Sequence, residues 1–213
     1  MSEIVSSAVE YVKEFFKEDA SGHDFYHTYR VYQLAMTLAE NEVCDREIVA
    51  LAALLHDVDD VKLVKQNAEP YHNAKEFLRG FSYPEERVNW IIEAISQISY
   101  KGKDSVIPES MEGKIVQDAD RLDAIGAIGI ARTFAYGGSR GNPMHIPEMQ
   151  YRENMSAEEY HSHRGSTINH FYEKLLLLKD SMNTASAKQM AEHRHQYMEE
   201  FLTEFYEEWD GRK

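Results

Sequence analysis

Residues 51–60 change abruptly from an apolar, helix-forming run to a cluster of ionisable side chains. The first five residues are leucine and alanine, which predicts a helix apolar enough to be buried. His56 and Asp57 follow at once, and Asp59 and Asp60 come directly after. Burying such groups is unfavourable unless something compensates, and a divalent cation is the simplest candidate. The alternative is a polar helix end, with the aspartates in water and His56 hydrogen-bonded in the core.

The composition describes an acidic chain long enough to bury a core. It has 213 residues, with 23 lysines and arginines against 37 aspartates and glutamates, and hence a net charge of −14. This balance argues against a nucleic-acid or anionic membrane surface, either of which would need a basic patch. A small phosphorylated substrate stays compatible, because a metal and a few local cations can invert the field in a pocket.

Compartment signals point to the cytoplasm. Cys44 is the single cysteine, which excludes an internal disulfide and fits a reducing environment. Residues 1–4 lead into an acidic, amphipathic helix with no basic targeting segment. The longest apolar runs, residues 48–55 and 124–131, are too short to span a bilayer.

Nearly every segment repeats its apolar residues with helical period, as in Val31, Leu34, Ala35 and Leu38. Asp45 is a suitable N-cap for the central helix, and residues 82–85 match a capping box. The expected helices cover residues up to about 18, then 23–40, 45–56, 73–79, 82–98, 109–136, 162–181 and 184–209.

The predicted fold class is therefore all-α, a single-domain helical bundle over residues 1–213. About residues 20–135 contain all the candidate metal-binding residues, and the helices within residues 156–210 are expected to pack on this part. Glycine-rich residues 137–150 are expected to form a mobile loop, either a lid or an ordinary connection. A split near this loop, into an N-terminal bundle and C-terminal helices packed on it, is the less favoured alternative.

Besides Asp59 and Asp60, just past the pair, two further places could supply partners for His56 and Asp57. Asp24, His27 and Arg30 are spaced three apart and so lie along one side of a helix. Taken alone, His27 could equally be a hydrogen-bonded core histidine. The second place is residues 117–123, where three aspartates stand between apolar residues that cover the intervening angles. These carboxylates cannot all face solvent while those apolar residues are buried.

This ordered set resembles the HD-domain superfamily of metal-dependent phosphohydrolases. Its signature is a histidine, a His-Asp doublet and a distal aspartate on separate helices, matched here by His27, His56, Asp57 and Asp120. The flanks are also similar to one bacterial subgroup, in which D-x-x-H-x-x-R-V corresponds to residues 24–31 and VQDADRLDAIGA to residues 116–127.

The resemblance implies one divalent metal ion, bound by His27, His56, Asp57 and Asp120. Two imidazoles and two carboxylates suit Mn²⁺, Mg²⁺, Co²⁺, Ni²⁺, Fe²⁺ or Zn²⁺. Asp118 is the alternative distal ligand, but residues two apart do not share a helical face. Relatives with two metals use additional histidines between the doublet and the distal aspartate. Since His72 is the only histidine there, a mononuclear site is expected.

Asp57 and Asp60 are the candidate catalytic residues. By resemblance Asp60 stands where related hydrolases place an acidic residue beside the attacking water, as general base or acid. Its alternative role is to support the ligands by hydrogen bonding. Arg30, Lys62 and Arg121 are candidates for binding the substrate phosphates, although each could instead form a structural ion pair.

The resemblance implies hydrolysis of a nucleotide, with a nucleoside triphosphate cleaved to a monophosphate and pyrophosphate as the leading activity. A 5′-nucleotidase or a nucleotide phosphodiesterase would use the same ion and water. A non-catalytic sensor of metal and nucleotide, and a plain helical interaction protein, are the alternatives of other classes. The expected partner is a small phosphorylated molecule, neither nucleic acid nor membrane, and a homodimer is left open.

Overall fold

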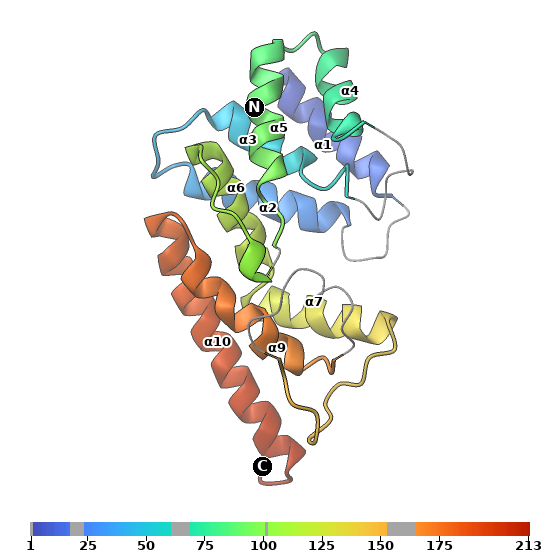
Figure 1. Cartoon of the computed structure of the whole chain (residues 1–213), viewed down its shortest axis with the longest axis vertical. Coiled ribbons are helices and arrows are strands. Elements are labelled where there is room, and N and C mark those ends of the chain that lie inside the picture. Colours follow the sequence, from blue (N-terminus) through green and yellow to red (C-terminus); the bar gives the residue numbers. More distant parts are fainter. Residues whose placement is uncertain (1, 18–23, 61–68, 101, 153–164) are drawn as a thin grey trace. The chain divides into compact units, whose positions relative to one another are not determined.

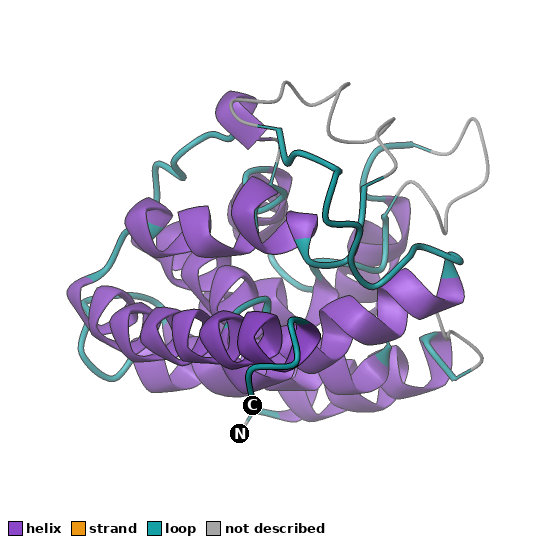
Figure 2. Ribbon diagram, turned by 90° about the horizontal axis from the view of Figure 1, so that it is seen from below, coloured by secondary structure: helices purple, strands orange, loops and turns teal. Residues whose placement is uncertain are grey.

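The computed structural model describes residues 2–17, 24–60, 69–100, 102–152 and 165–213. Within these ranges all regular secondary structure is helical, as Figure 2 shows, which confirms the all-α prediction. The chain divides into two compact units, Met1–Ser99 with Val106–Asp120 and Tyr100–Ser105 with Arg121–Lys213. The single domain expected over residues 1–213 stays a prediction.

The first unit is built around α3 (Arg46–Leu55), which contacts the three helices α1 (Glu3–Phe15), α2 (Phe25–Leu38) and α5 (Glu85–Ser96). Figure 1 labels them together with α4 (His72–Gly80) and α6 (Met111–Asp123). Residues 48–55 of α3 are all buried. A helix that is apolar on every side is stable only where neighbours surround it, and α3 therefore forms the core of this unit.

Asp45 begins α3, as its sequence context predicted. Its carboxylate accepts hydrogen bonds from the backbone N–H groups of Glu47 and Ile48 at 3.0 and 3.2 Å and pairs with Arg87 at 2.8 Å. The backbone N–H of Asp45 donates to the carboxylate of Glu112 on α6 at 2.8 Å. Contacts from α5, through Arg87, and from α6, through Glu112, therefore hold the start of the central helix in place.

The capping box predicted at residues 82–85 is wrong. Helix α5 starts at Glu85, and the residue before it, Pro84, has no side-chain cap. Ser82 has a positive φ of 52° and donates its N–H to the carbonyl of Arg79, ending the turn after α4. Glu85 pairs with Arg79 at 2.7 Å, so its carboxylate is engaged in an ion pair.

The single helix expected over residues 109–136 is two helices, α6 and α7 (Gly126–Ser139). Ile125 is extended between them, and Gly126 has a φ of +74°, which residues other than glycine rarely adopt. Arg194 donates to the carbonyl of Leu122 near the end of α6. The apolar period continues across the break because both helices bury a face, so periodicity alone does not reveal it.

The second unit contains η1 (Gly102–Asp104), α7, α9 (Asn169–Glu173), η2 (Leu175–Ser181) and α10 (Ala185–Trp209). The helix expected over residues 162–181 is described from residue 165 and is interrupted at Lys174, whose φ and ψ of −142° and −59° leave the helical region. The side chain of Thr184 accepts from the N–H of Ala187 and caps α10.

The loop predicted at residues 137–150 begins later than expected. Gly137 lies inside α7 and is buried against Thr167, where a Cβ would collide with the threonine hydroxyl. The helix therefore extends to Ser139, and the non-helical segment starts at Arg140. The mobility of this segment stays a prediction.

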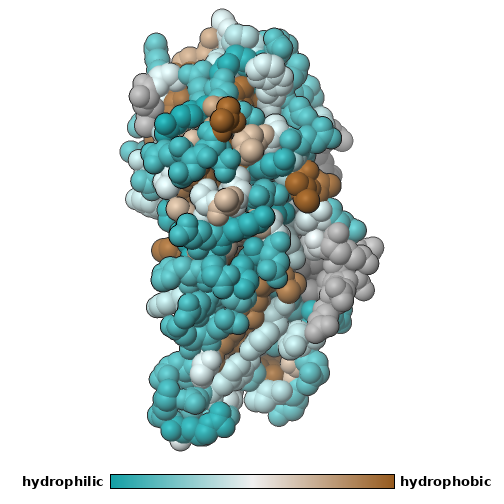
Figure 3. All heavy atoms as spheres, turned by 90° about the vertical axis from the view of Figure 1, so that its left-hand side faces the viewer, coloured by the Kyte–Doolittle hydropathy of each residue, from teal (hydrophilic) through white to brown (hydrophobic). Residues whose placement is uncertain are grey.

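The face drawn in Figure 3 is hydrophilic over most of its area, with apolar residues scattered among polar ones. Isolated exposed apolar side chains are normal on protein surfaces. Among the described helices, none combines the length and apolar character that crossing a membrane would require.

Replacing Asp45 with alanine should lower the free energy of unfolding by about 1 kcal/mol, because the N-cap is lost. Burial raises the pKa of Asp45, but hydrogen bonding to Arg87 and to the backbone outweighs this and lowers it overall. The ionised carboxylate of Asp45 thus stabilises the fold at neutral pH. This stabilisation is lost as the pH falls through the pKa that Asp45 has in the folded protein. Urea denaturation should show a wild-type advantage over Asp45→Ala that shrinks below about pH 4.

Asp45→Asn is the matched control, since asparagine keeps the capping oxygen and loses only the ion pair with Arg87. It should lose less stability than Asp45→Ala at pH 7. Equal losses in the two variants would contradict the capping role.

Candidate metal centre

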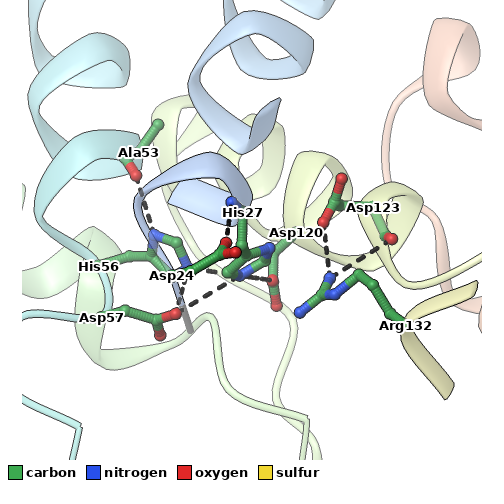
Figure 4. A network of polar contacts seen from close by, with 8 residues as sticks. All are labelled: Asp24, His27, Ala53, His56, Asp57, Asp120, Asp123 and Arg132. Carbon is green, nitrogen blue, oxygen red and sulfur yellow. Dashed lines mark hydrogen bonds and ion pairs between the residues drawn. The ribbon is translucent and has the colours of Figure 1, made fainter. Parts of the chain in front are cut away.

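Separate elements of the first unit carry the side chains of the candidate centre. His27 lies in the first turn of α2, and its ring is buried. His56 is the C-cap residue of α3, followed by Asp57 in the turn that ends the helix. Asp120 lies in the last turn of α6. The structure thus brings together the four residues that the sequence singled out as metal ligands (Figure 4).

The polar atoms of these side chains converge closely. Nε2 of His27 lies 3.4 Å from Oδ2 of Asp57 and 3.5 Å from Oδ1 of Asp120. Nε2 of His56 lies 3.3 Å from Oδ2 of Asp57 and 3.9 Å from Oδ1 of Asp120. The two imidazole rings are nearly perpendicular, at 74°, with their centroids 5.4 Å apart. Each carboxylate therefore approaches both imidazoles.

The orientation of the His56 ring is set by the backbone of its own helix. Nδ1 lies 2.8 Å from the carbonyl oxygen of Ala53, and because a carbonyl can only accept, Nδ1 carries the proton. In the neutral ring Nε2 then presents a lone pair to the cluster. The His56 side chain is only 3% exposed, and although Oδ2 of Asp57 lies 3.3 Å from Nε2, no partner meets hydrogen-bond geometry at this buried nitrogen. A buried nitrogen without a partner is costly, unless a ligand completes it.

The electrostatic field at this point favours positive charge. Burial of the ring lowers the pKa of His56, but the neighbouring carboxylates of Asp57 and Asp120 outweigh burial and raise the pKa to about 9. The same carboxylates would stabilise a bound cation.

The residues fit a divalent metal ion in donor type and spacing. Donor atoms of His27, His56 and Asp57 all lie within 4.8 Å of one another. Ligand atoms about 2.1 Å from one ion are separated by about 3 to 3.5 Å in octahedral or tetrahedral arrangements. Three of the four separations, at 3.3–3.5 Å, agree with that range, and the separation between His56 and Asp120 is longer, at 3.9 Å. A bound ion would also be the partner that the buried Nε2 of His56 lacks.

Of the two candidate distal ligands, Asp120 has the more suitable position. Its side chain is 28% exposed and its Oδ1 contacts both imidazoles. Asp118 is fully buried and lies two residues earlier on α6. Since side chains two apart on a helix diverge strongly, Asp118 faces a different side of α6.

Asp59 is an acidic residue whose structural role the sequence did not reveal. Its carboxylate accepts from the N–H groups of Asn73 and Ala74, both at 2.9 Å, in the first turn of α4. The sequence signal is weak because this cap is supplied from 14 residues away, outside the local pattern by which N-caps are recognised.

The other predicted site residues have different settings. Asp60 is half-buried, and its N–H donates to the carbonyl of Asp57 at 3.1 Å. Arg30 is half-buried on α2. Lys62 lies outside the described residues. Arg121 is buried and donates to the carbonyl of Ser181 at 2.6 Å within the second unit, so part of its hydrogen-bonding capacity supports the fold.

Comparisons with known proteins identify a family and several relatives. A family model described as the HD domain matches residues 24–125. The uncharacterised protein YpgQ of Bacillus subtilis is 38% identical over 203 residues, which cover 94% of this chain and 91% of YpgQ.

Solved structures share the fold over nearly the whole chain. A protein of Lactobacillus plantarum has a TM-score of 0.85 and 38% identity, with 99% of each chain covered. An HD-superfamily hydrolase of Bacillus thuringiensis has a TM-score of 0.77 and 43% identity, with 98% of this chain and 97% of the other covered. YpgQ in complex with ADP has a TM-score of 0.76 and 34% identity in the structural alignment, covering 96% and 97%.

Adding Mn²⁺ to metal-stripped protein should raise the melting temperature, because a ligand that binds only the folded state stabilises it. At 100 times the dissociation constant the gain is about 2.7 kcal/mol, or roughly 5–10 °C for a chain of this size. His56→Ala should lose most of this shift, measured by calorimetry against its own metal-free form.

His72→Ala is the control, since His72 is 52% exposed on α4 and pairs with Glu76. It should keep the full Mn²⁺ shift. An undiminished shift in His56→Ala would place the ion elsewhere.

Proposed function

Because the chain belongs to the HD-domain superfamily of hydrolases, we propose that this enzyme is a metal-dependent phosphohydrolase of nucleotides. The leading reaction is hydrolysis of a nucleoside triphosphate. Water adds to the α-phosphorus, and the bond between that phosphorus and the oxygen that bridges the α- and β-phosphates breaks. The products are the monophosphate and pyrophosphate.

One observation carries the proposal, namely the convergence of His27, His56, Asp57 and Asp120 on a point where Nε2 of His56 is buried without a hydrogen-bond partner. A fully paired polar cluster would serve the fold alone. In this one Nε2 of His56 lacks a hydrogen-bond partner, and the imidazoles and carboxylates gathered there are of the kind that binds a divalent ion. The nucleotide class is supported by the ADP complex of YpgQ, a relative with 34% identity.

In this proposal the same four residues hold one divalent ion. When bound, such an ion lowers the pKa of a water molecule and polarises the phosphoryl group. The identity of the ion follows from none of these distances, because imidazole and carboxylate ligands suit several metals.

The proposed roles of the remaining residues follow from their positions in the sequence relative to the candidate ligands. Asp60, three residues beyond Asp57, accepts a proton from the attacking water. Arg30 follows His27 by three residues on the same side of α2 and neutralises substrate phosphate, together with Lys62 and Arg121. Cations in such positions offset the negative charge that phosphoryl transfer concentrates on the oxygens.

A turnover screen tests the reaction. Metal-stripped protein restored with Mn²⁺, Mg²⁺, Co²⁺ or Ni²⁺ should release pyrophosphate and monophosphate from nucleoside triphosphates, as resolved by ion exchange. Asp57→Ala should abolish turnover, because it removes a carboxylate that approaches both imidazoles.

Other outcomes of the screen would replace the proposed reaction. Inorganic phosphate released from monophosphates would indicate a nucleotidase, and cleavage of diesters a phosphodiesterase. Tight nucleotide binding without turnover in any metal would indicate a sensor.

Asp60→Asn tests the proton acceptor separately. Asparagine keeps the size of the side chain but cannot take up a proton, so kcat should fall by roughly 10²–10⁴-fold while Mn²⁺ affinity stays near that of wild type. Asp59→Asn is the control, because the amide oxygen can still accept one of the two backbone hydrogen bonds of α4; its kcat should stay within a few-fold. A wild-type kcat in Asp60→Asn would exclude Asp60 as the base.

A further inference from the structure

The first turn of α2 depends on Asp24. The carboxylate Oδ1 of Asp24 accepts a hydrogen bond from the backbone N–H of His27 at 2.7 Å (Figure 4). Asp24 has extended φ and ψ of −76° and 167°, as expected of an N-cap. Its carbonyl also accepts from the N–H of Thr28 at 3.3 Å. Asp24 thus bonds the residue that carries the candidate ligand.

Burial anchors only part of this turn, namely His27 and Thr28. Phe25 is half-buried, Tyr26 is 67% exposed, and the first turn contains no acidic residue that would interact with the helix dipole. Phe25 stacks on Tyr29 of the same helix, with centroids 5.6 Å apart, a contact that cannot fix the helix start relative to its neighbours. The first turn of a helix frays most readily, because its N–H groups lack intrahelical acceptors.

Fraying at this point would displace a ligand. His27 is the third residue of α2, so loss of the cap loosens the backbone that carries its imidazole. Metal–ligand distances tolerate deviations of only about 0.2 Å, and small movements of His27 therefore weaken binding. His56, by contrast, lies at the C-terminal end of α3, whereas the N-cap of that helix, Asp45, lies at the other end.

We propose that Asp24 is a positioning residue of the metal centre, which holds His27 in its ligating position by capping α2. This inference rests on the proposed function, since it assumes that His27 binds the ion. Asp24 acts through the backbone of His27 and is not itself a ligand. Removing its side chain should therefore weaken metal binding in addition to lowering the stability of the fold.

Two N-caps in the same unit provide a matched comparison. Asp45 caps α3 through two backbone N–H groups, and His56 follows it by 11 residues, or about 16 Å along the helix. Removing the Asp45 cap should therefore lower the melting temperature of the metal-free protein without changing Mn²⁺ affinity. Removing the Asp24 cap should change both.

The measurement is Mn²⁺ titration by calorimetry, alongside the melting temperature of each metal-free variant. Asp24→Ala should bind Mn²⁺ at least tenfold more weakly than wild type, in line with the 10–100-fold effects of residues that orient metal ligands. Asp45→Ala should bind within twofold of wild type. Asp24→Asn, which keeps the capping oxygen and removes the charge, should bind within threefold.

Each contrary result has a defined meaning. Wild-type affinity in Asp24→Ala would overturn the positioning role, and Asp24→Asn as weak as Asp24→Ala would assign the effect to charge and overturn capping. Should Asp24→Ala not fold, Asp24→Gly removes the side-chain acceptor at a smaller cost in stability and replaces it. Absence of Mn²⁺ binding in wild type would instead refute the proposed function.

Discussion

The burial of α3 constrains the first unit more than any other feature. Residues 48–55 have no exposed side, so neighbouring helices must surround them, and the chain that leaves this core carries His56 and Asp57. Since Nδ1 of His56 is held by the carbonyl of Ala53, the core helix itself aims Nε2 away from its axis. The unmet nitrogen is thus a consequence of how the core helix ends, and the carboxylates of Asp57 and Asp120 assemble around it.

The sequence predicted those features that depend on local pattern. Apolar period identified the helices, Asp45 was recognised as a cap because its bonds run to residues two and three positions later, and the ordered His and Asp residues marked the side chains that converge. Their convergence could be inferred only through resemblance, since spacing along one chain does not determine how helices pack.

What local pattern missed has a physical explanation in each case. The break at Gly126 lies within an unbroken apolar period, and the backbone angles reveal it, with Ile125 extended and Gly126 at a φ of +74°. The carboxylate of Asp59 caps α4 across 14 residues, so it resembled a candidate site residue. Ser82 and Glu85 match a capping box in composition, but Glu85 is engaged with Arg79, an interaction that the pattern does not contain.

The helix ends at the centre are electrostatically unequal. His56 and Asp120 lie at or near the C-termini of α3 and α6, whose partial negative charge favours a cation. His27 lies near the N-terminus of α2, whose partial positive charge opposes one. A capping oxygen at that N-terminus accepts from an N–H group that would otherwise point unpaired toward the centre. Asp24 supplies this oxygen through its bond to the N–H of His27, so α2, which presents its unfavourable end to the centre, is also a helix whose cap bonds a candidate ligand directly.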